Sequence, residues 1–395
     1  MALAGCRVAD IPPRQPWAKT NPGPTPQRNL TRACVADFSP KTNYFPDQAR
    51  VQFAGQFTVS YHGHYKRLLF QPNVRTQEQE EYLLVQCGTP VPPHSSRTRV
   101  VTVPVQRFVL ANTAFGSAIV RMDLLPELVG IPSVNAISHP AIADAYQQGR
   151  VKEVGTGPHS SVELAIATEA QLFFTFYSAW PNYNTHPKLW EAGIQGIPTA
   201  DHFERHPLGR TEWIKFIALF FNREREANAI FEPAARNYQA LRDRTASVTH
   251  RPEVLVGWPS GRDIWNLNGA RNFFATFIHD AGGRYFWQDD LALSLVPANY
   301  ETVFDQQRAA PVFISRSYSA QTRKAFTQKY PSMSHFPSFQ ANRVWSPDKG
   351  TQLHRRPPWQ DQSLDYPERV LADLIYALHP ELIPHHAPHY LRPVD

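Results

Sequence analysis

The longest helical pattern of hydrophobic residues lies near the middle of the chain. Apolar side chains recur every three or four residues from Trp213 to Leu241, and this spacing places them along one face of a helix. Pro207 suits the first turn of such a helix, whereas Pro233 is expected to kink or divide it. The pattern therefore predicts a connecting helix within residues 206–248, on the order of 50 Å long.

On both sides of this helix, hydrophobic strands alternate with helical segments. Before it, "RVVTVPVQRFVLAN", "ELVGIPSVN", "VKEVGTG" and "LFFTFYSAW" have the composition of strands, with helical stretches between the later ones. After it, "EVLVGW" and "APVFISRS" predict strands, and "GARNFFATFIHDAGG" and "YPERVLADLIYALHPEL" predict helices. Such alternation is typical of parallel βα units. The expected fold class is α/β, with two Rossmann-like lobes joined by a long α-helix.

The part before the first lobe has a different pattern. "FTVSYHGHYKRLLF" and "EYLLVQCG" alternate apolar and polar residues, which predicts an N-terminal β-hairpin extension. Residues 7–48 are rich in Pro, Asn, Thr and Gln, as expected for a tether or an irregular wrapping segment. Four parts are expected: a lipobox and Pro-rich tether (1–48), an N-terminal α/β lobe with the hairpin extension (49–205), the connecting helix (206–248) and a C-terminal α/β lobe (249–395).

Composition narrows the class of protein. Hydrophobic residues make up 42% of the 395-residue chain and charged residues 19%, which fits a soluble globular protein with a packed core. No run of 18 apolar residues occurs, so the sequence predicts no membrane-spanning helix. The net charge is +6, but the basic residues form no dense block, so nucleic acid is not an expected partner. The GxSxG, GxGxxG, Walker and HExxH motifs are absent, and we expect no enzyme activity.

The three cysteines indicate an exported protein. Cys6 ends "LAGC", which resembles a bacterial lipobox, where a signal peptide is cut before a Cys that is then lipidated. The expected location is the periplasm or cell surface, anchored to the outer face of the cytoplasmic membrane. Cys34 and Cys87 remain, and this even remainder permits one disulfide, with two separate thiols as the alternative.

Each predicted lobe contains a short helix that opens with a glutamate and leads into a buried strand. Glu163 lies in "SSVELAIATEAQLFF", and Glu301 lies in "NYETVFDQQRAAPVF". An acidic residue near a helix N-terminus stabilises the helix by roughly 0.3–1 kcal/mol, which accounts for each glutamate by itself. That effect does not account for their matched placement in the two lobes.

These features resemble the helical-backbone class of ABC-transporter substrate-binding proteins, which carry ferric siderophores, haem or cobalamin. The resemblance covers roughly residues 50–390 and rests on "HPLGRTEWIKF", "IHDAGG", "ERVLADLIYALHPEL" and the two Glu-led helices. It implies a monomer that works with an ABC permease and its ATPase, and docking of Glu163 and Glu301 on arginines of the permease. The chain departs from the family pattern at "HRRPPWQDQSLDYP", where many relatives have an Asn-Asp-aromatic-Glu cluster; Trp359 stands where the aromatic residue is expected.

Ligand-binding residues are expected where the strands of the two lobes end, because open α/β sheets bind ligands beyond the carboxyl ends of their strands. The first lobe offers Asn112, Thr113, Phe115, Asn135, Tyr177 and Trp180; the second offers Trp258, Arg262, Trp265, Arg316 and Tyr318; and the connecting helix offers Arg210 and Trp213. For Trp180 and Trp213 the alternative is packing in the core. Arginine forks and flat tryptophan rings suit a large anionic metal chelate better than a bare ion.

The resulting hypothesis is a lipid-anchored binding protein that captures a ferric siderophore-like chelate and delivers it to a permease. We expect no intrinsic cofactor and no metal site; the nearest candidate, "HGH" with His62 and His64, is interpreted as a solvated hairpin. A cobalamin or haem carrier of the same fold is the first alternative. The second is a cell-surface hydrolase, which would need two carboxylates about 5–10 Å apart and for which Asp263 is a weak candidate.

Overall fold

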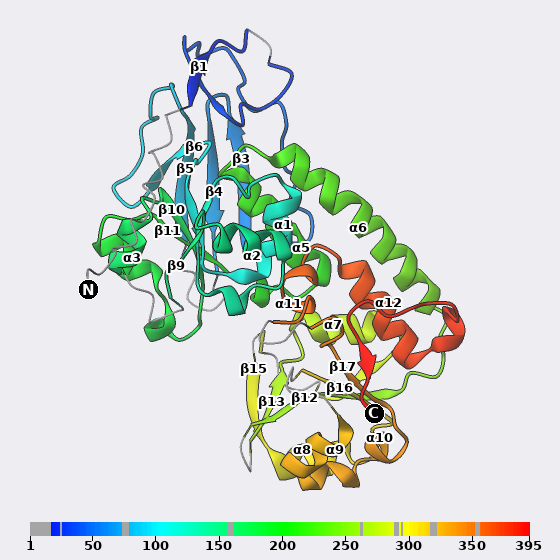
Figure 1. Cartoon of the computed structure of the whole chain (residues 1–395). Coiled ribbons are helices and arrows are strands. Elements are labelled where there is room, and N and C mark those ends of the chain that lie inside the picture. The colour runs from blue at the N-terminus through cyan, green and yellow to red at the C-terminus, as the bar shows by residue number, and fades with distance from the viewer. Residues whose placement is uncertain are drawn as a thin grey trace, which may run out of the picture.

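Two α/β lobes lie one above the other, and the helix α6 (Glu224–Thr245) runs along one side of both (Figure 1). This computed structural model describes residues 17–23, 26–72, 79–155, 162–260, 264–287, 292–293, 295–316, 322–351 and 356–395. The predicted fold class is confirmed. Within the described part of the chain, no helix has the length and apolar character needed to cross a membrane.

The N-terminal lobe is built on a parallel sheet of five strands in the order β11-β10-β7-β8-β9. These strands are β7 (Phe108–Leu110), β8 (Leu128–Ile131), β9 (Lys152–Glu153), β10 (Leu172–Phe176) and β11 (Gly196–Thr199). Its helices are α1 (Gly116–Arg121), α2 (Pro140–Gln147), α3 (Val162–Ala167) and α4 (His186–Glu191). The central strands are continuous apolar runs because helices cover both faces of such a sheet.

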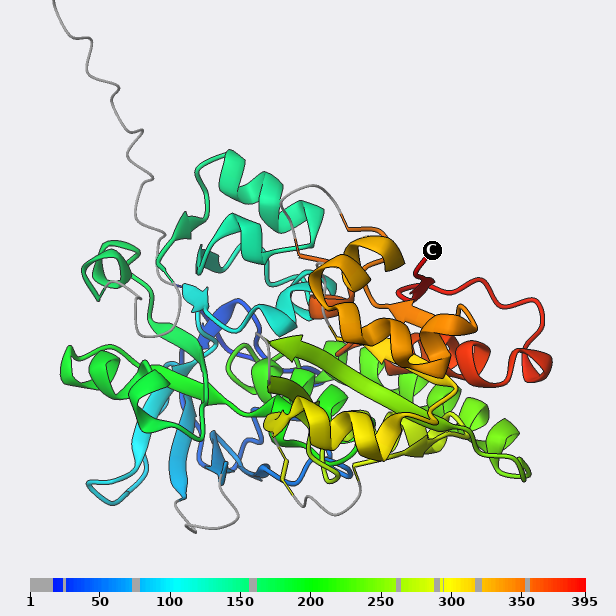
Figure 2. The same cartoon turned by 90° about the horizontal axis from the view of Figure 1, so that it is seen from below.

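The C-terminal lobe has a mixed sheet in the order β15-β13-β12-β16-β17-β18, with β14 also paired to β12. Its strands are β12 (Glu253–Ser260), β13 (Ile264–Asn268), β14 (Arg284–Tyr285), β15 (Leu295–Asn299), β16 (Val312–Ser315), β17 (Val344–Ser346) and β18 (Arg392–Pro393). The helices that follow α6 are α7 (Phe273–Asp280), α8 (Tyr300–Gln307), α9 (Arg323–Lys329), α10 (Pro337–Gln340), α11 (Trp359–Gln362) and α12 (Pro367–Leu378), and of these α7, α8 and α10 contact strands of the sheet. Figure 2 shows the molecule from below. Among the described strands of this lobe, β14, β16 and β17 follow the parallel pattern that the sequence predicted around β12.

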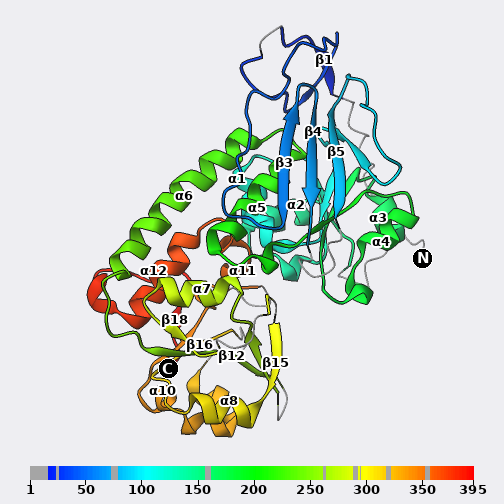
Figure 3. The ribbon, with the colours of Figure 1, turned by 180° about the vertical axis from the view of Figure 1, so that it is seen from behind.

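The N-terminal extension is larger than the predicted hairpin. It is a four-stranded sheet of β3 (Phe57–His62), β4 (Tyr65–Phe70), β5 (Glu80–Gln86) and β6 (Arg99–Val103), which lies beside α5 (Figure 3). The segment "RVVTV" was predicted to be a strand of the first lobe, and this was wrong, because it forms β6 and pairs in parallel with β5. Ahead of this sheet, β1 (Ala18–Thr20) and β2 (Ala33–Val35) form a short parallel pair.

The described residues before the sheet wrap around it and are not a free tether. Tyr44 and Phe45 are fully buried, and the Phe45 ring packs against Lys66 and Tyr61. Cys34 in β2 and Cys87 directly after β5 form a disulfide. The disulfide and the buried aromatic rings therefore fasten this segment to the extension sheet.

The connecting segment consists of two helices, α5 (Pro207–Leu219) and α6, so the chain is divided, but at another position than the predicted one at Pro233. The break falls at residues 220–223, where Asn222 adopts a φ of 57°, and Pro233 lies inside α6 without dividing it. Lys66 from β4 reaches the break: its Nζ donates to the Leu219 carbonyl at 2.6 Å and to Asn222 Oδ1 at 2.8 Å. It thus satisfies a carbonyl that the end of α5 leaves without a helical partner.

The extension sheet packs against α5. Phe57 and Phe70 meet Trp213 and Phe216 edge to face or tilted, with ring centroids 5.2–6.1 Å apart. Every residue of α5 is buried, so this helix belongs to the core and α6 alone forms the outer strut.

Candidate ligand-binding site between the lobes

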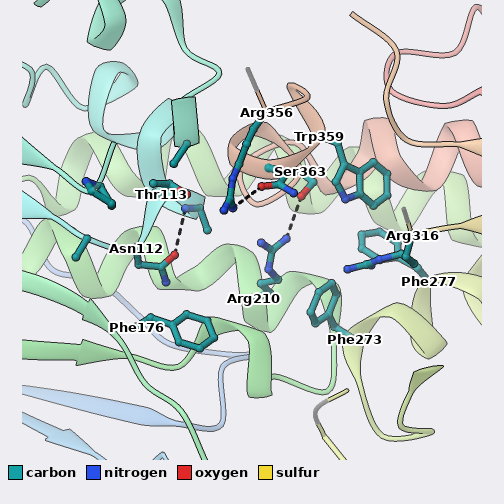
Figure 4. Close-up of a pocket in the computed structure, with 15 residues that line it drawn as sticks. Asn112, Thr113, Phe176, Arg210, Phe273, Phe277, Arg316, Arg356, Trp359 and Ser363 are labelled. Atoms are coloured by element: carbon teal, nitrogen blue, oxygen red, sulfur yellow. Dashed lines mark hydrogen bonds between the residues drawn. The ribbon is translucent and has the colours of Figure 1, made fainter. Parts of the chain in front are cut away.

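A cavity of about 360 Å³ lies between the two lobes, beyond the carboxyl ends of several strands (Figure 4). Both lobes and the start of α5 contribute to its wall. Its lining comprises Ala111, Asn112, Thr113, Ala114, Pro132, Ala136, Phe176, Arg210, Phe273, Phe277, Arg316, Arg356, Trp359, Gln360 and Ser363. The volume falls in the range of small-molecule sites, and the position is the one expected for open α/β sheets.

A buried aspartate holds two polar residues of the cavity wall. Asp201 follows β11 and is 2% exposed; its Oδ1 accepts from Asn112 Nδ2 at 3.0 Å, and its Oδ2 accepts from Arg210 Nε at 3.1 Å. The second Nδ2 hydrogen of Asn112 goes to Thr199 Oγ1, and its Oδ1 caps the turn at Ala114. Asn112 is therefore a scaffold of the site, because both of its amide hydrogens are used within the protein.

Arg210 joins the lobes at the floor of the cavity. Its Nη1 donates to Ser363 Oγ of the C-terminal lobe at 3.1 Å, opposite its bond to Asp201. The guanidinium also lies 4.8 Å from the centroid of the Phe273 ring. These bonds use two of the five guanidinium N–H groups, so the remaining donors can meet ligand oxygens.

Two further arginines come from the C-terminal lobe. Arg316 directly follows β16, and its guanidinium lies over the Phe274 ring, 4.5 Å from the centroid. Arg356 precedes α11, and its Nη1 donates to Gln360 Oε1 at 2.7 Å. In Figure 4 the three arginine side chains come from different elements and extend into the same cavity.

Aromatic rings form the remaining walls. Phe176 ends β10 and is 47% exposed, and its ring stacks on His202 with centroids 4.1 Å apart. Burial lowers the pKa of His202 to about 4, so the imidazole beneath Phe176 is neutral at physiological pH. Phe277 and Trp359 face the cavity from the C-terminal lobe. The rings offer flat apolar area beside the guanidinium groups.

The charge of the cavity wall is positive. Three arginines line it, and its lining residues include no Asp, Glu, His, Tyr, Cys or Met among the described part of the chain. Such a wall supplies hydrogen-bond donors and positive charge but no group that readily coordinates iron. It suits a ligand with several anionic oxygens and a flat apolar part.

Comparison with known proteins shows what this architecture is similar to. Two uncharacterized lipoproteins of Methanocaldococcus jannaschii are 24% and 23% identical to this chain; each match covers 76% of the chain, and 73% and 76% of the relatives. A periplasmic heme binding protein from Pseudomonas aeruginosa matches with a TM-score of 0.55 at 18% identity, and the match covers 74% of this chain and 98% of that protein. A TroA-like periplasmic binding protein from Veillonella parvula has a TM-score of 0.53 at 17% identity, and the match covers 75% of this chain and 96% of that protein. No protein-family model matches.

The chain has the fold of the periplasmic substrate-binding proteins of ABC transporters. The resemblance seen in the sequence is thus confirmed at the level of the fold. These solved proteins are covered almost completely, whereas about a quarter of this chain lies outside each match. The substrate-binding-protein fold therefore carries additional residues here.

Four of the residues predicted from the sequence line the cavity of this substrate-binding-protein fold: Asn112, Thr113, Arg210 and Arg316. Three others belong to the core: for Phe115 and Trp265 this corrects the prediction, and for Trp213 it is the alternative that the sequence left open. Phe115, Trp213 and Trp265 are 0% exposed; Trp213 Nε1 donates to Glu204 Oε1 and Trp265 Nε1 donates to the Val256 carbonyl. Their indole and phenyl rings stabilise the lobes and do not form the cavity wall.

The other predicted residues lie elsewhere or outside the described residues. Tyr177 packs between Phe70, His186 and Phe203. Trp180 is 74% exposed and borders a separate shallow hollow with Ser178 and Tyr183. Asn135 is exposed next to the lining residue Ala136, and Trp258 is half-buried in β12. Arg262, Tyr318, Asp263 and Cys6 lie outside the described residues.

Sequence reasoning missed a group of lining residues on α7 and around α11: Phe273, Phe277, Arg356, Trp359, Gln360 and Ser363. The segment "RRPPWQDQSLDYP" was noted for its departure from the family pattern, but no strand was predicted directly before it. Its Arg and Trp beside two prolines were the available signal.

The remaining sequence candidates are placed as follows. Glu163 and Glu301 are both exposed in the first turns of α3 and α8, and Asn299 Oδ1 caps the start of α8 at 2.8 Å from Glu301 N. His62 stacks on Tyr65, while His64 contacts Phe38. Among the residues that the structure describes, no three His, Cys, Asp or Glu side chains are grouped so as to hold a metal ion.

Proposed function

We propose that this chain is the extracytoplasmic substrate-binding protein of an ABC importer and that it carries a ferric siderophore-like chelate. The ligand would lie in the cavity between the lobes, which three arginines and four aromatic rings line. The combination of this fold with a cationic, aromatic interlobe cavity is the observation that carries the proposal. Guanidinium groups favour catecholate or carboxylate oxygens, and the rings favour the flat faces of a chelate.

Haem is the second candidate, since a structural neighbour from Pseudomonas aeruginosa is a heme binding protein. Arginines could meet haem propionates, but an exposed haem iron usually takes an axial His, Cys, Met or Tyr ligand. The described lining residues offer none of these. A chelate whose iron is already fully coordinated needs no such ligand, and this favours the siderophore-like chelate over haem.

A titration followed by visible absorbance and intrinsic fluorescence tests the proposed ligand class. The whole protein is titrated in parallel with an anionic ferric catecholate chelate, a cationic ferric hydroxamate chelate, haem and cobalamin. We expect the anionic chelate to bind at least tenfold more tightly than the cationic one, because three positive side chains face it. Equal or stronger binding of the cationic chelate would contradict the proposal, and binding of haem with a ligated Soret spectrum would favour the second candidate.

The proposed partners are an ABC permease and its ATPase, reached from a lipid anchor at Cys6. Support comes from the relatives, which are named lipoproteins, and from the disulfide, which is characteristic of oxidising compartments outside the cytoplasm. The chain is proposed to act as a monomer with no intrinsic cofactor and no enzyme activity. Its two exposed glutamates, Glu163 and Glu301, are proposed to pair with arginines of the permease.

Charge reversal at both glutamates tests the docking proposal. The Glu163→Lys/Glu301→Lys variant should abolish uptake of the radioactive iron chelate into cells that carry the cognate permease, because two attractive contacts become repulsive. Ligand affinity should stay within twofold of the unmodified protein, since neither side chain lines the cavity. A matched control is Glu232→Lys/Asp243→Lys, which reverses two exposed carboxylates on α6. Uptake that survives in the first variant, or is lost equally in the control, would reject the assignment.

A further inference from the structure

The short helix α11 belongs to the C-terminal half of the chain but is bonded to the N-terminal lobe. The Ser138 hydroxyl donates to Asp361 Oδ1. Four residues later, Asp365 Oδ2 accepts from Ser117 Oγ at 3.0 Å and from Arg121 Nη1 at 3.0 Å. Ser117 and Arg121 lie on α1, and Ser138 lies just before α2, so both aspartates bind the same side of the N-terminal lobe.

The fit between α11 and this lobe is close. Asp361 is 2% exposed and Asp365 is 0% exposed. A methyl group added to Gly116 of α1 would lie 3.2 Å from Asp361 Oδ2, so a larger residue there would require the Asp361 side chain to shift by a few tenths of an ångström. The Arg121 guanidinium also covers the Tyr366 ring, 4.3 Å from its centroid. These contacts bury two carboxyl groups at the junction of the lobes.

The same turn forms a wall of the proposed ligand cavity. Trp359, Gln360 and Ser363 line the cavity, and Ser363 accepts from Arg210. Asp361 and Asp365 belong to the same short stretch of sequence, but their carboxyl groups contact the N-terminal lobe. The bonds of these two carboxyl groups to the N-terminal lobe therefore hold the ligand-facing residues in place.

We infer that α11 is a latch, in which Asp361 and Asp365 act as positioning residues that fasten a cavity wall of the C-terminal lobe to the N-terminal lobe. This inference rests on the proposed ligand role of the cavity, and it adds the residues that set the shape of that cavity. Docked α11 completes the wall, whereas released α11 removes Gln360 and Ser363 from it and frees Arg210 from its bond to Ser363.

The latch should respond to pH because its carboxyl groups are buried. Burial raises the pKa of Asp361 and of Asp365 to about 6, and it raises the pKa of the neighbouring Glu368 to about 7. The charged groups that face them are Arg121 on α1 and Arg369 on α12, and His139 contributes a backbone N–H. Asp361 Oδ2, Asp365 Oδ1 and Glu368 Oε2 have no hydrogen-bond partner among the described residues, which favours their neutral forms.

The direction of the pH dependence of docking follows from proton linkage. The docked state binds protons that the released state, with ordinary aspartate pKa values near 4, gives up. Docking is therefore strongest below about pH 4, weakens as the pH rises from about 4 to about 6, and changes little above that. Each aspartate with a docked pKa of about 6 favours docking about tenfold more at pH 5 than at pH 8.

Hydrogen exchange of the whole ligand-free protein tests the latch without any ligand. The measurement is the protection of the backbone amides of residues 359–366, relative to the intrinsic exchange rate at each pH. We expect protection to rise at least tenfold from pH 8 to pH 5, with no matching change in β10. In Asp365→Ala, protection at residues 359–366 should fall at least tenfold at pH 5. In Asp361→Asn, which keeps an acceptor for Ser138 and mimics the neutral acid, protection at pH 8 should rise. The control Asp243→Asn, an exposed carboxyl on α6, should change nothing.

Protection that is unchanged in Asp365→Ala, or that rises with pH in the unmodified protein, would overturn the latch. If Asp365→Ala folds poorly, the latch is still tested by the Asp361→Asn variant and by the pH series of the unmodified protein. Binding of the anionic ferric chelate is measured separately, and Asp365→Ala should weaken it about tenfold or more. Failure of the unmodified protein to bind any chelate would reject the proposed function while the exchange result still decides the latch.

Discussion

Replacing Lys66 by Met is expected to lower the free energy of unfolding by about 3–5 kcal/mol, because it leaves a buried carboxylate without its partner. Lys66 Nζ lies 2.5 Å from Glu224 Oε1, and both side chains are 0% exposed. The substitution removes this ion pair together with the bonds to the Leu219 carbonyl and to Asn222. Chemical denaturation at neutral pH measures the loss.

The defect should shrink as the pH falls. Burial raises the pKa of Glu224, and the charge of Lys66 opposes that rise. Without Lys66 the pKa of Glu224 rises further, so Glu224 becomes neutral at a pH that leaves ordinary carboxylates charged. A group whose pKa is raised in the folded protein destabilises the fold as the pH rises through that value. Lys66→Met should therefore be closer in stability to the unmodified protein at pH 5 than at pH 8.

Two matched variants separate this effect from a simple loss of packing. Lys66→Met/Glu224→Gln removes both charges, keeps an acceptor for Asn29 Nδ2 and should recover more than half of the lost stability. Arg67→Met removes the neighbouring charge on β4, whose partner Glu81 is partly exposed, and should cost at most about 1 kcal/mol. A double variant as unstable as the single one would show that the buried charge is not the cause.

The sequence predicted the two lobes because their strands are continuous apolar runs, and this signal does not depend on contacts distant in sequence. The break at residues 220–223 was missed because Phe220 and Phe221 continue the apolar pattern. The interaction that stabilises the break comes from Lys66, more than 150 residues away. Asn222, a residue type that tolerates positive φ, was the only local signal.

The candidate site was predicted in part for a similar reason. Residues that follow buried strands, such as Asn112 and Arg316, were found because the strand ends locate them. The residue type does not tell whether a tryptophan packs in the core, as Trp213 and Trp265 do, or lines a cavity, as Trp359 does. That difference arises from the extension sheet over α5 and from the docking of α11, and neither contact has a signature in the local sequence.

Replacing Arg210 by Met is expected to weaken binding of the anionic ferric chelate at least about 30-fold, which corresponds to about 2 kcal/mol or more. Arg210 is 9% exposed, so its charge is only weakly screened by water. Its loss removes positive charge at the floor of the cavity and the bridge between Asp201 and Ser363. It also leaves the Asp201 carboxylate unopposed beside an anionic ligand. Isothermal titration of the folded variant, well below its melting temperature, gives the affinity.

The contribution of the unopposed carboxylate can be measured with a second variant. Arg210→Met/Asp201→Asn removes that charge while it leaves an acceptor for Asn112, so part of the affinity should return. Arg210→Lys keeps a positive charge but cannot reach Asp201 and Ser363 together, and an intermediate affinity is expected. The exposed Arg236→Met on α6 serves as the control and should bind like the unmodified protein. Because the proposed ligand lies against Arg210, an affinity of folded Arg210→Met equal to that of Arg236→Met would move the ligand site away from this cavity.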